Sequence, residues 1–270
     1  MYSDIALEKQ AGKRRVSTGT LYLQPELYGE DITASAWQQR ALADFASRAG
    51  DEAFPCLFCR KAWKDGTIRF LFAECGPDLE YDDLLLGLTD YTNFVQRTDI
   101  KDRLLTPLVV FFETSRLQSG PLHTLGWDIL NWVHRMDPAP WPADVPDEPD
   151  QADWSFCFNG VQLFVNMSSP EHEALRSRNL GGCLTFVINP RENFDALASL
   201  KTRSGKLVRE RIRARVAAFN GGAVPQELGF YGDENNREWM QYQLEEDSLP
   251  RPAACPFSPR KSLLKKPGSA

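Results

Sequence analysis

The feature that most constrains the fold of this chain is the run PLVVFFE at residues 107–113. Its apolar residues are consecutive, and they are aliphatic, mostly β-branched, or aromatic. A short run of this kind predicts a strand that is buried inside a sheet. The remaining segments then have to provide the strands that pair with it and the helices that cover it.

Helical spacing of apolar residues and strong turn signals organise the rest of the chain. Ser35 is a good N-cap, the prolines after Met136 cannot continue a helix, and Gly221-Gly222 is a good helix end. Turn residues between apolar runs predict hairpins. The predicted helices cover 36–50, 78–97, 122–136 and 204–222, the single strands cover 107–113 and 184–190, and the hairpins cover 54–74 around Lys64-Asp65-Gly66 and 154–169 around Asn159-Gly160.

This order of elements predicts one α/β (α+β) domain with a mixed β-sheet, in which hairpins and strand–helix–strand passages are covered by helices. The Pro/Asp-rich connection at 138–153 is the best candidate for an internal boundary, but it is too slight to indicate two domains. We expect a flexible N-terminal segment at 1–30, a single domain at 31–257 and a disordered basic tail at 258–270.

Composition excludes some partners. The 270 residues carry a formal charge of −6, which argues against nucleic acid and suits either a cationic small molecule or plain solubility. No run of about 18 apolar residues exists to cross a membrane, and the N-terminus does not have the pattern of a secretory signal. The six cysteines are scattered rather than arranged as a disulfide framework, so we expect a reduced, cytoplasmic setting.

The standard catalytic signatures for nucleotide binding, zinc proteolysis and serine hydrolysis are missing from this sequence. Cys56 and Cys59 have CxxC spacing, but their flanks predict strands rather than the strand-to-helix junction of redox motifs. Cys56 could present a thiolate to a soft metal, or it could be an ordinary buried cysteine. Cys255 is followed by Pro256, and such Cys-Pro pairs occur at heme-thiolate contacts and also in many ordinary loops.

Other candidate ligands also have an ordinary alternative. His134 could bind iron, or it could bond to a neighbouring loop; it lies about 16 Å along the predicted helix from His123, too far to share one metal. Arg209 and Arg213 belong to a row of cations on the helix at 204–222, with Lys206, Arg211 and Arg215. Such a row would suit the propionates of a porphyrin, and it is equally typical of a solvated helix face.

The segment at 232–242, GDENNREWMQY, is the most unusual of the chain. It places ionisable and amide side chains beside large aromatic ones without a clear period. A carboxylate here could accept two N–H groups of a guanidinium, or the segment could be a tight polar turn.

Seven short motifs together, in this order, resemble the YqcI/YcgG family. The resemblance runs from about residue 37 to residue 257 and so covers nearly the whole predicted domain. Two positions depart from many relatives, which have Gly in place of Cys59 and His in place of Arg191. The motifs are FPCLF at 54–58, PLVVFFE at 107–113, HRMDPAPWP at 134–142, WSFCFNG at 154–160, INPRENFDAL at 188–197, GFYGDENNREWMQY at 229–242 and CPF at 255–257.

The resemblance implies a heme-dependent monooxygenase that N-hydroxylates the guanidino group of L-arginine, giving Nω-hydroxy-L-arginine, or of a related compound. It implies heme b, O₂ and a separate electron-donor reductase, and it makes residues 31–257 the heme-binding domain. Within that scheme Cys56 is the first choice as iron ligand, with Cys255 and His134 as alternatives, and Arg209 and Arg213 are candidates to contact the heme. Glu234, Asp233 and Tyr242 are the catalytic candidates, and Glu113, Asn235 and Trp239 the substrate-binding ones.

Two other functions fit the same sequence. The first is a heme-binding or heme-sensing protein without turnover, and the second is a hydrolase or transferase, without heme, that acts on an arginine-like substrate through the 232–242 segment. A visible spectrum separates the last from the other two, and the response of that spectrum to L-arginine separates the enzyme from the sensor.

Overall fold

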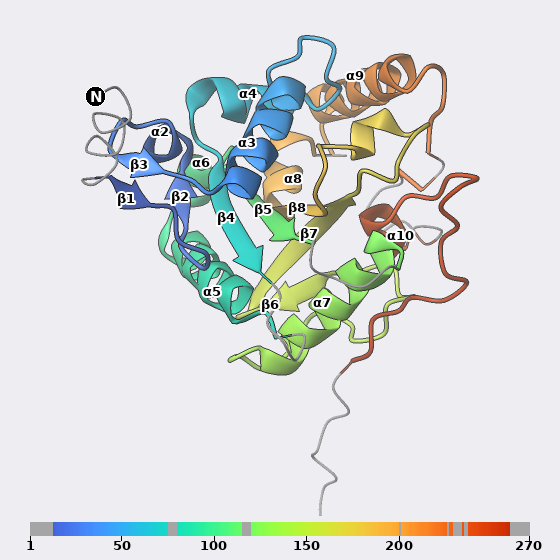
Figure 1. Ribbon diagram of the computed structural model, residues 1–270. Coiled ribbons are helices and arrows are strands. Elements are labelled where there is room, and N and C mark those ends of the chain that lie inside the picture. Colours follow the sequence, from blue (N-terminus) through green and yellow to red (C-terminus); the bar gives the residue numbers. More distant parts are fainter. Residues whose placement is uncertain are drawn as a thin grey trace, which may run out of the picture.

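The computed structural model describes a mixed sheet covered by helices on both faces, which confirms the predicted fold class (Figure 1). The sheet order is β2-β4-β5-β8-β7-β6, and β1 pairs with β3 in a small separate ribbon. The residues described are 13–74, 80–114, 120–199, 201–225, 227–228, 234 and 237–259. The strands are β1 (Arg14–Arg15), β2 (Tyr22–Leu23), β3 (Ile32–Thr33), β4 (Arg69–Glu74), β5 (Leu108–Glu113), β6 (Phe156–Phe158), β7 (Val161–Ser168) and β8 (Thr185–Pro190).

The pairing of the strands is mixed. β4 and β5 are parallel, with Leu71 opposite Val110, whereas the other neighbouring pairs of the sheet are antiparallel. A parallel pair needs a long crossover, and α5 and α6 provide it between β4 and β5. The helices are α2 (Gln24–Leu27), α3 (Ala36–Ala49), α4 (Leu57–Asp65), α5 (Asp82–Arg97), α6 (Ile100–Arg103), α7 (Leu122–Met136), α8 (Arg191–Leu197), α9 (Arg203–Phe219) and α10 (Glu238–Tyr242), with a 3₁₀ turn at Arg176–Arg178.

Apolar residues follow one another without interruption at 107–112 because the strand that they form is buried on both faces of the sheet. Side chains alternate between the faces of a sheet, so Val109 and Phe111 pack with α3 and α4, whereas Val110 and Phe112 pack with α5 and α7. Figure 1 shows α3 and α4 on one side of the sheet and α5 and α7 on the other. The two cores explain why this segment has no polar residue before Glu113.

Local signals place several elements where the sequence predicts them. Ser35 caps α3 in a reciprocal arrangement with Gln38, whose side chain accepts from the Ser35 N–H at 2.8 Å. Asn159 and Gly160 have positive φ angles of 50° and 73°, as the tight turn between β6 and β7 requires. Gly221, with φ 67°, follows the end of α9.

The predicted hairpin over 54–74 is wrong in its first half. Residues Leu57–Asp65 form α4, and only β4 is a strand. Gly66 has φ 68° and ends the helix, donating to the carbonyls of Ala62 and Trp63. Glycine in this conformation ends a helix as readily as it makes a turn, so the turn signal at 64–66 is real but belongs to a helix.

Part of the predicted N-terminal segment and the connection at 138–153 both belong to the folded domain. Within the segment 1–30, residues 13–30 contain β1, β2 and α2, and Tyr22 is only 2% exposed; residues 1–12 lie outside the described part. The connection at 138–153 is tied to the domain, since the Trp239 indole donates to Asp150 at 3.2 Å and the Trp141 ring packs against His134 with ring centroids 5.4 Å apart. Residues 260–270 of the predicted tail also lie outside the described residues.

Candidate functional site

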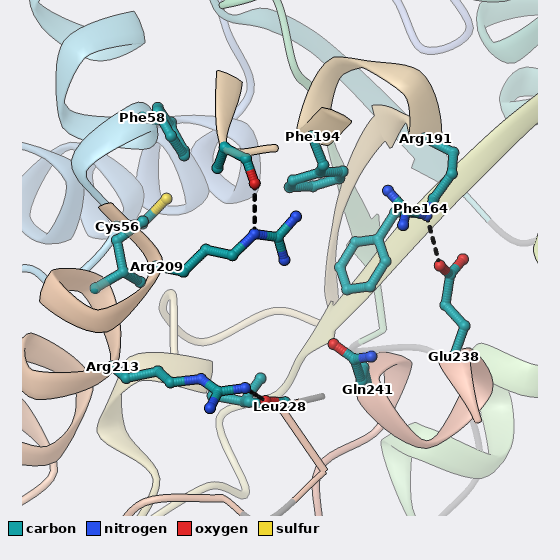
Figure 2. Close-up of a pocket in the computed structure, with 12 residues that line it drawn as sticks. Cys56, Phe58, Phe164, Arg191, Phe194, Arg209, Arg213, Leu228, Glu238 and Gln241 are labelled. Carbon is teal, nitrogen blue, oxygen red and sulfur yellow. Dashed lines mark hydrogen bonds and ion pairs between the residues drawn. The ribbon is translucent and has the colours of Figure 1, made fainter. Parts of the chain in front are cut away.

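A pocket lies where α9, the start of α4 and the end of the sheet meet (Figure 2). It has about 850 Å³ of empty space, counting the part open to solvent. Its walls come from α4, β7, α8, α9 and α10, which are far apart in the sequence. They combine aromatic and aliphatic side chains with three arginines, one carboxylate and one thiol. The lining residues are Cys56, Phe58, Phe164, Arg191, Phe194, Ala198, Arg209, Ile212, Arg213, Leu228, Glu238 and Gln241.

The thiol belongs to Cys56, which is the N-cap of α4 rather than part of a strand. Its sulfur accepts the Cys59 backbone N–H at 3.3 Å. Burial raises the pKa of the Cys56 thiol, while the backbone N–H groups of Cys59 and Phe58 and the charge of Arg178 act in the opposite direction. A helix N-terminus stabilises a thiolate, and Cys56 lies at one that the sequence did not predict, although a loop after α3 rather than a strand leads into it.

Two arginines of α9 extend over the pocket on the same side as Cys56 in Figure 2. The Arg209 Nε donates to the Ala198 carbonyl at 2.6 Å, and Arg213 donates to the Leu228 carbonyl. Burial, with the nearby charge of Arg191, lowers the pKa of Arg209. These two predicted residues therefore line a pocket instead of a solvated helix face.

Glu238 is the carboxylate of the pocket, and it is almost completely buried at 1% exposure. Its Oε2 forms an ion pair with the Arg191 Nε at 2.9 Å, and its Oε1 accepts from the Ser155 hydroxyl at 2.6 Å and lies 3.0 Å from the Tyr242 hydroxyl. Burial raises the pKa of Glu238 to about 7, although Arg191, Ser155 and Tyr242 each act to lower it.

The frame around Glu238 is rigid. The Tyr242 hydroxyl lies 2.9 Å from the Leu163 carbonyl and accepts the Phe156 N–H at 3.1 Å, so α10 is fixed to both strands of the β6–β7 hairpin. Trp239 is fully buried and faces Asp150 and Trp127 rather than the pocket. Tyr242 thus lies beside the site as a support for Glu238, and Trp239 lies behind it.

The other predicted site residues are not brought to this pocket. Glu113 is half-buried at the end of β5, and its charge acts on Cys183. Glu234 is exposed, with its carbonyl bonded to Arg237. Asp233 and Asn235 lie outside the described residues.

His134 and Cys255 are found elsewhere, on the α7 side of the sheet. His134 packs between Trp141 and Phe257, with ring centroids at 5.4 and 4.8 Å, and borders a separate hollow under the 138–153 connection. Burial raises the pKa of Cys255 to about 12. Neither of them lines the pocket of Cys56, so the structure does not bring these two candidate iron ligands to that pocket.

The chemistry of the Cys56 pocket fits a heme. A thiol at a helix N-terminus is a suitable iron ligand, Phe58, Phe164 and Phe194 give flat apolar surfaces, and Arg209 and Arg213 are suitable partners for propionates. The described cysteines 56, 59, 157, 183 and 255 are all free. No group of three or more His, Cys, Asp or Glu among the described residues could hold a metal ion by itself.

The sequence did not identify Glu238 or its partner Arg191 as site residues. Ser155 and Arg191 are 83 and 47 positions away from Glu238, and no local spacing connects them. The Glu-Trp-Met-Gln-Tyr stretch has one turn of helix, too short to show a period, and the structure shows it as α10. The one useful signal was the density of polar and aromatic residues at 232–242.

Comparison with known proteins gives a consistent result along the chain. A model described as the YqcI/YcgG family matches residues 44–258. The chain is 40% identical over 239 residues to a Streptomyces lavendulae protein named "Putative N(omega)-hydroxy-L-arginine synthase DcsA", covering 87% of this chain and 89% of that protein. Two proteins of Bacillus subtilis (strain 168) are each 32% identical to this chain. The match to YcgG covers 85% of this chain and 91% of YcgG. The match to YqcI covers 91% of this chain and 97% of YqcI. No solved structure matches. Among the described residues, no helix has the length and apolar character needed to cross a membrane.

Proposed function

This chain belongs to the YqcI/YcgG family, and from that membership we propose that it N-hydroxylates the guanidino group of L-arginine or of a related guanidino compound. The observation that carries the proposal is the 40% identity, over nearly the full length of both chains, to a relative named "Putative N(omega)-hydroxy-L-arginine synthase DcsA". The buried carboxylate of the pocket supports it, because a carboxylate is the natural partner of a guanidinium.

The reaction we propose uses heme b, O₂ and electrons from a separate reductase. One oxygen atom enters the guanidino N–H bond and the other leaves as water, which consumes two electrons and two protons. When bound, a thiolate-ligated heme supplies the oxidising power that an unreactive nitrogen requires. Cys56 would hold the iron, and Arg209 and Arg213 would pair with the propionates.

The residues of the chain itself would position the substrate. Glu238 in its ionised form binds the guanidinium, and the Ser155 and Tyr242 hydroxyls keep that carboxylate in one orientation. Phe164 and Phe194 cover the space beside it and exclude water, which strengthens the ion pair. Precise placement of one nitrogen is a large part of what such a site can contribute.

The experiment that tests the function is a spectrum followed by a product assay. Protein loaded with heme should show a thiolate-type ferrous–CO Soret band, L-arginine should perturb the spin state, and mass detection should find a product with one added oxygen. Cys56→Ser should abolish that Soret band, whereas Cys255→Ser should keep it. A spectrum that L-arginine does not perturb, with no oxygenated product, would indicate a heme-binding protein without turnover and would refute the proposal. A chain that takes up no heme refutes it as well.

A further inference from the structure

Arg191 separates two cavities. It lines the pocket of Cys56 and Glu238, and it also lines a second cavity. That second cavity is bordered by the carboxylates of Asp144 and Asp195 and by the ion pair of Arg103 with Glu192. Arg191 is the first residue of α8, and its side chain reaches Glu238 in the first pocket.

In the pocket of Cys56, the guanidinium of Arg191 is bound to the carboxylate of Glu238. Arg191 is 7% and Glu238 is 2% exposed at the side chain, and the Nε–Oε2 separation is 2.9 Å. The other carboxylate oxygen is occupied by Ser155 and Tyr242. The protein therefore already holds, in its own structure, the group that a guanidino substrate would bring to the same carboxylate.

A substrate guanidinium cannot simply be added to this arrangement. The charge of Glu238 is already matched by Arg191, which is paired with it at 2.9 Å. A second guanidinium at the same carboxylate would meet the repulsion of Arg191 in a partly buried space. Exchange of one guanidinium for another keeps the charge of the pocket constant.

We propose that Arg191 is a resident guanidinium that occupies Glu238 in the free protein, and that a guanidino substrate binds by displacing it toward the second cavity. This inference rests on the proposed function, because it describes how the substrate reaches that site. The carboxylates of Asp144 and Asp195 offer the displaced side chain a new partner, whereas Glu192 is already paired with Arg103. Ser155 and Tyr242 hold Glu238 in place during the exchange. Arg191 is then a positioning residue, since it acts on the substrate through Glu238.

The exchange predicts that removal of Arg191 improves binding of a small guanidinium. The probe is methylguanidinium, titrated calorimetrically into full-length protein as purified. In the free wild type the site is occupied by Arg191, which lowers the apparent affinity. We expect Arg191→Ala to bind methylguanidinium at least tenfold more tightly than the wild type, and the double variant Arg191→Ala/Glu238→Gln to lose that gain.

Arg251→Ala is the matched control. Arg251 is a half-buried arginine paired with Glu227 at 2.7 Å, outside both cavities, so its removal also leaves a carboxylate without its guanidinium. Equal gains in the two single variants would overturn the proposal, because the effect would then belong to any orphaned carboxylate. An unchanged affinity in Arg191→Ala overturns it too.

A second measurement keeps the test decisive if Arg191→Ala does not fold. In wild-type protein the side-chain Nε–H resonance of Arg191, assigned with Arg191→Lys, should move on addition of L-arginine and saturate with it. A resonance that stays in place while L-arginine binds refutes displacement. If L-arginine is N-hydroxylated with that resonance unmoved, the proposed function stands and the exchange fails. If methylguanidinium displaces Arg191 but no oxygenated product forms from L-arginine, the exchange stands and the proposed function fails.

Discussion

Replacement of Glu238 by glutamine should remove a specific dependence of stability on pH. The pKa of Glu238 is raised from 4.5 to about 7, mainly by burial. The folded state thus holds this proton more tightly than the unfolded chain does. The protonated form gives full stability below pH 4.5, and that contribution is lost as the pH rises through 7.

The magnitude follows from the two pKa values. At about 1.4 kcal/mol for each tenfold change in proton affinity, ionisation of Glu238 lowers the free energy of unfolding by about 3 kcal/mol when the pH is well above 7. Between pH 5.5 and pH 8.5 the loss amounts to about 2 kcal/mol. Glutamine has no proton to lose, so Glu238→Gln lacks this slope.

Urea unfolding of both proteins between pH 5.5 and 8.5 measures the effect. The stability of the wild type minus that of Glu238→Gln should fall by about 2 kcal/mol over this range. The histidines titrate in both proteins and cancel in the difference. Glu192→Gln is the control, because its side chain is 56% exposed and its removal changes no buried carboxylate. A flat difference for Glu238→Gln, or the same fall for Glu192→Gln, would refute the reasoning.

Three further perturbations have defined outcomes. Tyr242→Phe removes the hydroxyl that accepts the buried Phe156 N–H and so should lower the free energy of unfolding by about 1–3 kcal/mol in urea; no measurable loss contradicts the proposed support of α10. Burial lowers the pKa of His123 to about 3, so the neutral form is stabilising above pH 6.5 and this contribution is lost as the pH falls. Chemical unfolding at each pH should show that the wild type loses about 3 kcal/mol relative to His123→Leu between pH 7 and pH 4. Parallel pH profiles of the two proteins would contradict this prediction. Gly205→Ala would place a Cβ against the Ser199 backbone and should cost about 1–3 kcal/mol, whereas Gly120→Ala, with open space around it, should cost little; equal melting temperatures would show that the start of α9 can move.

Much of the fold was accessible from local signals. The continuous apolar run of β5, the cap at Ser35 and the Asn159-Gly160 turn each act within a few residues, and each predicted its element correctly. The segment at 57–65 failed because its apolar residues and its glycine suit a strand and turn as well as a helix. Packing of Ala62 in the core between the sheet and α3 decides between them, and no short window of sequence contains that information.

The site was accessible only in part. Cys56, Arg209 and Arg213 were chosen from the sequence and line one pocket, since a thiol and a row of cations are visible in isolation. Glu238 was missed because its role depends on Arg191 and Ser155, which reach it from the start of α8 and from the residue before β6. A carboxylate on a polar surface and one that is 1% exposed look the same in a sequence.

The attachment of Glu238 to the β6–β7 hairpin has a consequence for how such a protein can diversify. The carboxylate is fixed through Ser155, Tyr242 and the Leu163 carbonyl, whereas Phe58, Phe194 and Ile212 are apolar side chains that line the pocket from α4, α8 and α9. Substitutions at these three positions can reshape the space around a ligand without disturbing the group that anchors it. One anchoring frame can therefore serve a lineage of catalysts that differ in the length and shape of the molecules they accept.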